Sequence, residues 1–250
     1  MFHAKLDSTK TWKQIVDALA TLLTEIHLVV SERGIQLTQY DSSRAAMVHL
    51  SLPRNVFQEF VCEGERDICV GVDEIVRVSK RMASDDRLEF TLDEIGNRLE
   101  IRMIGIAVRT FKLQLLTPPE ERTQSLNPIF DVRAEMFSDG FKQAVKDIGV
   151  VSNHMRITAT TQSLSFTGSG DTGEVEVLLT LGDDSSIYNL HVENTASSMF
   201  ALSYLTEIAK AISSDSIILQ MSSNKPVLLE FIIAESGQMR FLLAPRVDRR

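Results

Sequence analysis

Hydrophobic and polar residues alternate along most of the chain. Residues 98–103 read Arg-Leu-Glu-Ile-Arg-Met, and residues 68–72 and 88–92 follow the same period of two. Such alternation places the apolar side chains on one face of an extended strand and is typical of half-buried antiparallel sheets. We therefore expect strands to make up most of the fold.

Four stretches have helical spacing instead, at about 10–23, 73–82, 136–148 and 201–212. In the first stretch, six apolar side chains fall on one helical face: Trp12, Ile15, Val16, Leu19, Leu22 and Leu23. A strand-rich chain with a few short helices predicts an α+β fold whose helices cover one face of the sheets.

The chain contains two copies of one pattern. Lys-Gln-Ile-Val-Asp-Ala-Leu at 13–19 returns as Lys-Gln-Ala-Val-Lys-Asp-Ile at 142–148, at an offset of 129. The strand pattern at 87–92 returns at 216–221 with the same offset. Matches in the same order at a nearly constant offset indicate an internal repeat of one supersecondary unit.

A polar segment separates the two copies. Residues 117–125 contain two prolines and several charged or amide side chains without hydrophobic periodicity, and apolar residues return at 126–130. A stretch of this composition cannot bury enough apolar surface to fold alone. We therefore expect an N-terminal domain at 1–116, a connecting linker at 117–129 and a C-terminal domain at 130–250.

Charge is distributed unevenly between the predicted helices and the rest. The chain has 26 basic and 34 acidic residues, a net charge of −8, which excludes a uniformly basic nucleic-acid-binding protein but allows a local basic face. The four helical stretches hold eight bases and six acids, a net charge of +2. Two interpretations remain open: solubilising helix surface, or helices that together face a polyanion.

Composition also restricts the cellular setting. No run of eighteen apolar residues is present, so we expect no membrane span, and the first seven residues lack the pattern of a signal peptide. The two cysteines, Cys62 and Cys69, are too few for a disulfide framework and fit a reducing compartment. They could pair across adjacent strands, but the pattern favours two free, partly buried thiols.

The motifs of the common enzyme classes are missing. The five histidines are scattered without metal-ligand spacing, so we expect no metal, no cofactor and no catalytic site. His27 and His154 each begin a strand pattern at an offset of 127, which favours matching structural positions. The Gly-Ser-Gly-Asp-Thr-Gly segment at 168–173 lies between two strand patterns and predicts a hairpin turn rather than a phosphate loop. Asp41-Ser42-Ser43 predicts another turn.

Several segments resemble the proliferating cell nuclear antigen family of replication sliding clamps. They are the opening Met-Phe-His-Ala-Lys-Leu, the turn Tyr-Asp-Ser-Ser-Arg at 40–44, Lys-Pro-Val at 225–227 and the ending Leu-Leu-Ala-Pro-Arg at 242–246. The resemblance covers the whole chain, and the missing acidic tail makes it archaeal-like. It implies two pseudo-repeated clamp domains in a trimeric ring, with antiparallel sheets outside and four short helices per chain lining the inner face.

The resemblance also assigns a DNA-binding surface. The helices would line a channel around double-stranded DNA and contact its phosphates without reading bases. The positions implied for these contacts are Lys13, Arg77, Lys80, Arg81, Lys142, Lys146 and Lys210.

A second implied site is a pocket for partner peptides with a Gln-x-x-aliphatic-x-x-aromatic-aromatic motif. Its positions would be Tyr40, Ala45, Met47, Leu126, Ile129, Pro226, Leu242, Leu243, Ala244 and Pro245. Each could instead be an ordinary core residue, but apolar side chains at the end of a charged linker are harder to explain by core packing alone.

Two strand patterns have the features of free edges, which invite pairing with another chain. Following the family, strands at 108–113 and 174–179 would pair head to tail between subunits. The interface positions are Val108, Thr110, Phe111, Leu113, Val175, Val177 and Leu179.

The resemblance thus implies a non-enzymatic processivity factor and homotrimer. Its expected partners are DNA polymerase, flap endonuclease, DNA ligase and a clamp-loading ATPase. The location would be cytoplasmic and nucleoid-associated in an archaeon, or nuclear in a eukaryote. The alternatives are one subunit of a heterotrimeric or checkpoint-type clamp and, from another class, an enzyme with a cryptic site.

Overall fold

The computed structural model describes residues 1–124, 126–182 and 186–246 and divides into two compact units. The first unit contains residues 1–44, 48–125 and 232–239, and the second contains residues 45–47, 126–231 and 240–250. Ser125 of the predicted linker and the last four residues of the predicted C-terminal domain lie outside the described residues.

Strands dominate the chain, as the alternating pattern predicts. The helices are α1 (Thr9–Ala20), α2 (Val72–Ser79), α3 (Ser138–Ile148) and α4 (Leu202–Ala211), with one 3-10 turn, η1 (Arg54–Val56). The strands up to the linker are β1 (Phe2–Leu6), β2 (Glu25–Ser31), β3 (Gly34–Tyr40), β4 (Ala46–Pro53), β5 (Glu59–Cys62), β6 (Arg66–Gly71), β7 (Arg87–Asp93), β8 (Arg98–Ile104) and β9 (Val108–Gln114). Those after it are β10 (Val132–Phe137), β11 (His154–Ala159), β12 (Ser163–Gly170), β13 (Gly173–Thr180), β14 (Ile187–Val192), β15 (Ala196–Ala201), β16 (Ser216–Met221), β17 (Val227–Ile233) and β18 (Gly237–Leu243).

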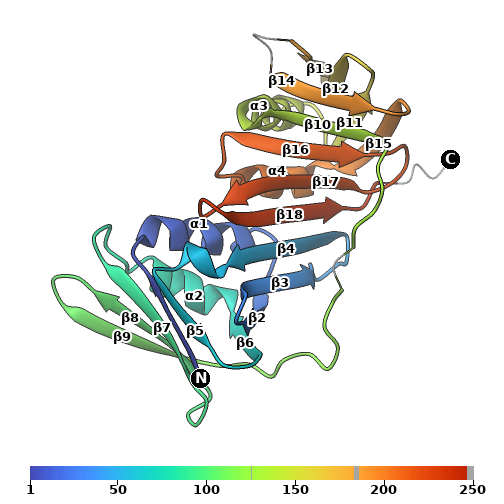
Figure 1. Ribbon diagram of the computed structural model, residues 1–250. Helices are drawn as coiled ribbons and strands as arrows, with labels where there is room; N and C mark the ends of the chain where they lie inside the picture. The colour runs from blue at the N-terminus through green and yellow to red at the C-terminus, as the bar shows by residue number, and fades with distance from the viewer. Residues whose placement is uncertain (125, 183–185, 247–250) are drawn as a thin grey trace. The chain divides into compact units, whose positions relative to one another are not determined.

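In the first unit, a five-stranded antiparallel sheet has the order β5-β1-β7-β8-β9, and strands β4-β3-β2-β6 follow one another in a second sheet. Helices α1 and α2 lie side by side (Figure 1). The buried indole Nε1 of Trp12 donates to Ser79 Oγ at 3.0 Å and links the two helices. The apolar face of α1 therefore packs into the core, with Trp12, Ile15, Val16 and Leu19 all buried.

The second unit repeats this arrangement strand for strand. Its strands follow the orders β14-β10-β16-β17-β18 and β13-β12-β11-β15, and α3 packs against α4. The first strand of each copy pairs with the predicted repeat strand, β1 with β7 and β10 with β16. The internal repeat read from the sequence is thereby confirmed.

Backbone contacts give the exact correspondence between the copies. Helix α2 begins directly after Gly71, which lies opposite Glu25, and α4 begins directly after Ala201, which lies opposite His154. The counterpart of His154 is therefore Glu25 rather than His27, so the predicted match of the two histidines is wrong. The offset of 127 joins two histidines that are alike in residue type but occupy different positions in their strands.

Three of the helices begin without a side-chain cap because each follows a strand directly. Their first amide groups are satisfied by distant carbonyls: Val72 N donates to Thr24 O at 2.9 Å, and Leu202 N donates to Asn153 O at 3.0 Å. Helix α1 is different, since Ser8 Oγ accepts from Thr11 N at 3.1 Å as an N-cap.

The helices end earlier than the spacing predicts in three cases. Helix α1 stops at Ala20, and the hydroxyl of its C-cap Thr21 donates to Ala18 O at 2.7 Å; Leu22 and Leu23 lie in the following turn. Helix α2 stops at Ser79, so Lys80 is its C-cap and Arg81 lies beyond it. Helix α4 stops at Ala211, one residue short of the prediction.

Both predicted turns are present. Strands β12 and β13 form a hairpin in which Gly170 lies opposite Gly173, and only Asp171 and Thr172 intervene. Gly173 has φ of +149°, a backbone conformation that side-chain-bearing residues rarely adopt. After β3, the Asp41 carboxylate accepts from Ser43 N at 3.1 Å and closes the second turn locally, which gives Asp41 a structural role.

Candidate nucleic-acid interface and peptide site

Three of the predicted DNA-contacting residues in the first unit are well exposed. Arg77 lies in the last turn of α2 and pairs with Glu74 one turn earlier at 2.7 Å. Lys80 and Arg81 follow the helix and are exposed. The fourth, Lys13 on α1, is only half-buried, and its ammonium donates to Met82 O at 2.9 Å. One of the three ammonium donors of Lys13 is therefore already used within the first unit.

The second unit presents Lys142, Lys146 and Lys210. Lys146 and Lys210 are exposed in the last turns of α3 and α4, and Lys210 pairs with Glu207 at 2.7 Å. Lys142 lies one turn before Lys146 and is half-buried. Cations in a last turn also interact favourably with the helix dipole, so helix stabilisation alone accounts for part of this pattern.

The predicted interface strands lie at sheet edges. β9 ends the five-stranded sheet of the first unit, and β13 ends the four-stranded sheet of the second. Phe111 lies opposite buried Ile101, and Val177 lies opposite buried Phe166, so both face inward yet remain half-buried. Incomplete burial of inward-facing apolar side chains is what an edge lacking its next strand produces.

The remaining predicted interface residues range from exposed to buried. Val108 and Thr110 are exposed on β9, whereas Leu113 and Val175 are half-buried and Leu179 is 7 % exposed beneath α3. The two edges differ in charge. β9 carries Lys112, which pairs with Glu100 at 2.5 Å, and β13 carries the exposed Glu174 and Glu176.

Two of the predicted peptide-pocket residues belong to one buried cluster in the second unit. Met47, Leu228 and Leu242 pack together, and half-buried Phe130 covers them. Leu228 and Phe130 are not among the predicted pocket residues. Leu228 lies in a continuous apolar run, so the sequence contains no signal that separates it from ordinary core. Met47 is only 4 % exposed, which gives it a packing role in the chain described.

Most of the other predicted pocket residues are more accessible than the members of this cluster. Ala244 is exposed, and its amide donates to Ala45 O at 2.9 Å, which keeps the chain after β18 beside residue 45. Pro226 and Pro245 are half-buried, whereas Leu243 is fully buried. Tyr40 ends β3 in the first unit and is 38 % exposed.

The linker supplies the most exposed apolar side chains of the predicted pocket. Leu126 is 46 % exposed and Ile129 is 90 % exposed. Neither belongs to the buried cluster. An apolar side chain held almost entirely in water has no packing role within its own unit, and apolar surface of this kind marks interaction sites when it is grouped.

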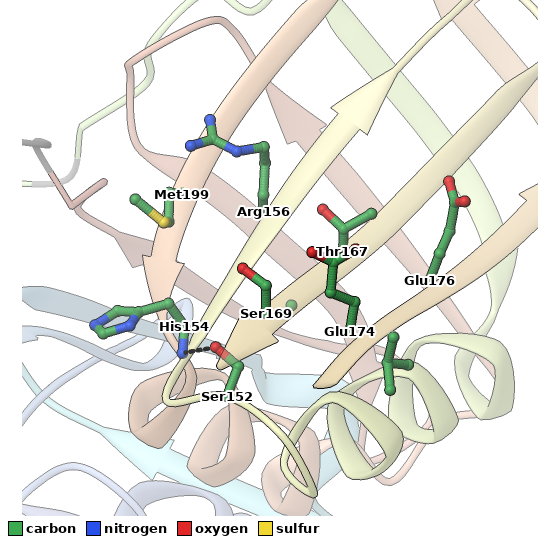
Figure 2. A pocket seen from close by; sticks show the side chains of 10 residues that line it. Ser152, His154, Arg156, Thr167, Ser169, Glu174, Glu176 and Met199 are labelled. Atoms are coloured by element: carbon green, nitrogen blue, oxygen red, sulfur yellow. Dashed lines mark hydrogen bonds between the residues drawn. The ribbon is translucent and has the colours of Figure 1, made fainter. Parts of the chain in front are cut away.

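A polar hollow of about 500 Å³ lies on the second unit's four-stranded sheet, and Val175 is the predicted interface residue that lines it (Figure 2). Arg156, Thr167 and Glu176 line it as cross-strand neighbours. The Oγ of Ser152 accepts from His154 N at 3.2 Å at one end. The lining comes from separate strands and has no sequence motif, so sequence reasoning could not have found it.

The cysteines are free and buried. Burial raises the pKa of the Cys69 thiol to about 11, and the nearby carboxylates of Asp67 and Glu25 add to the shift. Burial also raises the pKa of the Cys62 thiol. Neither thiol is activated as a nucleophile, since the reactive form is the thiolate.

The described residues contain neither a metal-ligand cluster nor a helix that could span a membrane. Residues 1–124, 126–182 and 186–246 hold no group of three or more metal-ligating side chains. In the same residues, every helix is too short or too polar to cross a membrane.

Two repeated α+β units, each with two packed helices and two sets of antiparallel strands, define the clamp fold. The family model for the N-terminal domain of proliferating cell nuclear antigen matches residues 1–105, and the model for the C-terminal domain matches residues 127–246. The chain belongs to the proliferating cell nuclear antigen family.

Individual relatives agree with this assignment. The chain is 34 % identical over 241 residues to the DNA polymerase sliding clamp of Thermofilum pendens, covering 96 % of each chain. It is 32 % identical over 248 residues to the DNA polymerase sliding clamp of Thermococcus sibiricus, covering 99 % of each. The crystal structure of the antigen from Thermococcus kodakaraensis superposes with a TM-score of 0.92 at 27 % identity, covering 98 % of this chain and all of the other.

Proposed function

We propose that this protein is a DNA sliding clamp, a non-enzymatic processivity factor that forms a ring of three identical subunits around double-stranded DNA. Relatives that match over nearly their whole length are named DNA polymerase sliding clamps. In this proposal residues 1–116 and 130–250 are the two clamp domains and residues 117–129 connect them.

The observation that carries the ring is a correspondence between strands. By strand order, β9 in the first copy is the counterpart of β18 in the second, and β13 is the counterpart of β4. Among the described residues, β9 and β13 each have a neighbouring strand on one side only. Pairing of β9 with β13 of another subunit would give each edge its missing neighbour, and the head-to-tail contact would close by rotation.

Charge favours the same pairing. Lys112 on β9 and the two glutamates on β13 have opposite sign, and complementary edges of this kind set register and suppress wrong partners. The half-buried Phe111 and Val177 would become fully buried in the joint sheet. Since neither edge is complementary to itself, the contact is head to tail rather than two-fold.

The helices supply the surface that faces DNA. Lysine and arginine at the helix ends contact phosphates by charge alone, so the ring would hold any sequence and slide along it. The residues outside the helical stretches, with a net charge of −10, then form the outer surface, away from the duplex.

Partner enzymes would bind through short peptides. A peptide of the form Gln-x-x-aliphatic-x-x-aromatic-aromatic would place its apolar side chains against exposed Leu126 and Ile129 and the chain end at Ala244 and Pro245. Polymerase, flap endonuclease and ligase would share this site, and a clamp-loading ATPase would open and close the ring.

Polymerase stimulation tests the proposal. The chain is added, with a clamp-loading ATPase and a DNA polymerase, to a primed single-stranded circle, and product length is measured. We expect long products with the wild type and short ones with the edge variant Thr110→Pro. Equal product lengths with and without the chain would refute the function.

A further inference from the structure

The linker is held at its first end by an arginine. Arg122 Nη2 donates to both carboxylate oxygens of Asp67 at 2.8 Å, and Arg122 Nη1 pairs with Glu65 at 2.5 Å. Both acids belong to the first unit, and Asp67 lies on the edge strand β6. A two-pronged contact of this kind fixes the direction of the guanidinium as well as its position.

The receiving carboxylate is itself held in place. His27 Nε2 lies 2.5 Å from Asp67 Oδ1, and the His27 ring is 7 % exposed. The amide of His27 donates to Gln39 Oε1 at 2.8 Å. Burial raises the pKa of Asp67, but hydrogen bonds from His27 and Arg122 outweigh it and leave the pKa below its ordinary value. Asp67 is therefore charged at neutral pH.

A second arginine holds the other end. Arg240 Nη1 donates to Asn127 Oδ1 at 3.0 Å, and Arg240 Nε lies 3.2 Å from Glu230 Oε2. Both charged side chains are only 17 % exposed, and they lie on neighbouring strands β18 and β17 of the second unit. The pair is half-buried, and Nη1 is the guanidinium nitrogen that reaches the linker.

Leu126 lies between these two contacts, and Ile129 follows the second one. Four residues separate Arg122 from Asn127, and Leu126 and Ile129 lie on either side of that asparagine. The linker thus has little apolar packing of its own and depends on polar contacts for its position. A linker freed from them would lose conformational entropy when a partner ordered it, and affinity would fall accordingly.

We infer that Arg122 and Arg240 are positioning residues for partner binding: they fix the linker so that Leu126 and Ile129 remain exposed in a conformation ready to receive an apolar peptide. The inference rests on the proposed peptide site and adds the groups that pre-organise it. Neither arginine needs to touch the peptide.

The salt dependence of peptide affinity distinguishes a positioning role of Arg122 from direct contact with the peptide. Exposed ion pairs weaken as salt screens them, whereas apolar burial does not. The affinity of an uncharged peptide should therefore decline with added salt in the wild type, because the Arg122 contact loosens. The decline should be absent in Arg122→Gln.

The test uses the full-length protein and a peptide Gln-x-x-Leu-x-x-Phe-Phe with neutral residues at x, titrated by calorimetry at two salt concentrations. Asn127→Ala removes the second contact while leaving the Arg240–Glu230 pair intact. We expect Arg122→Gln and Asn127→Ala to bind roughly three- to tenfold more weakly, with Arg122→Lys recovering part of the loss. Matched controls are Arg66→Gln, which breaks a β6 ion pair with Glu94, and Asn189→Ala, which breaks a hydrogen bond with Glu135.

A spin label at Gln124→Cys reports linker mobility directly. Mobility should increase in Arg122→Gln and return toward the wild-type value when peptide is added. Unchanged affinity and mobility in both variants would overturn the inference while leaving the peptide site in place. A wild-type chain that does not bind the peptide would overturn the peptide site, and the inference with it.

Discussion

The guanidinium of Arg109 is ion-paired with the buried carboxylate of Asp86 and also donates to Arg81 O at 2.8 Å. Asp86 in turn accepts from Ala83 N at 2.7 Å. An arginine on the edge strand β9 therefore fixes the loop that follows α2. That loop carries Lys80 and Arg81, so one ion pair connects the proposed subunit edge to the proposed DNA surface.

Replacing Arg109 with alanine should destabilise the fold, because it leaves the Asp86 carboxylate buried and unpaired. We expect a loss of about 3 kcal/mol in the free energy of unfolding, at the low end for a broken buried pair since Arg109 is 37 % exposed. Urea unfolding at one protein concentration measures it. The comparison variant is Arg102→Ala, whose pair with Glu89 is more exposed and should cost under about 1 kcal/mol. Equal losses in both would contradict the assignment.

Proline on either edge strand should abolish the trimer. Thr110→Pro and Val177→Pro each remove a backbone N–H from an edge strand, and proline is not tolerated inside a strand that is paired on both sides. Light scattering should give the 28.0 kDa monomer for each variant. Thr110→Val keeps the amide and should remain trimeric. Trimers from both proline variants would place the subunit contact elsewhere.

Removing helix cations should weaken DNA binding uniformly across sequences. Each lost phosphate contact should reduce the slope of log affinity against log salt by about 1. Lys80→Ala and Lys146→Ala remove exposed cations, and the combined variant should lose more than either alone. Arg98→Ala, at the start of β8, provides an exposed cation outside the helices as a control. A wild-type chain with a marked sequence preference would contradict phosphate-only contact.

The double variant Leu126→Ala and Ile129→Ala should lose about 1–3 kcal/mol of peptide affinity, mostly through faster dissociation. Its trimer mass should not change, because both side chains are exposed and lie outside the edge strands. Surface plasmon resonance with the same peptide measures the rate. Lost affinity together with a broken trimer would mean that these residues have a structural role.

The fold was predictable from the sequence because period and repeat are properties of the chain itself. Alternation identified the strands, and the 129-residue offset identified the two copies. The predicted match of His27 with His154 is wrong because residue types recur by chance. The hydrogen bonds from Val72 N to Thr24 O and from Leu202 N to Asn153 O show that Thr24 and Asn153 are equivalent, and therefore that Glu25 and His154 are equivalent.

The site was predictable only in part. Exposed Ile129 stands out because an apolar residue in a charged linker violates the local pattern. Phe130 and Leu228 pack with Met47 and Leu242, but no sequence pattern separates them from ordinary core residues. The contacts of Arg122 and Arg240 are also invisible in sequence, since their partners lie 55 and 113 positions away.

Topological retention on DNA tests the central claim most directly. The clamp is loaded onto a nicked circular plasmid, the circle is cut once with a restriction enzyme, and the protein that remains bound is measured by gel filtration. A closed ring that encircles the duplex should stay on the circle and slide off the linear product, and blocking the linear ends with a bulky bound protein should restore retention. Equal retention on circular and unblocked linear DNA would contradict the account.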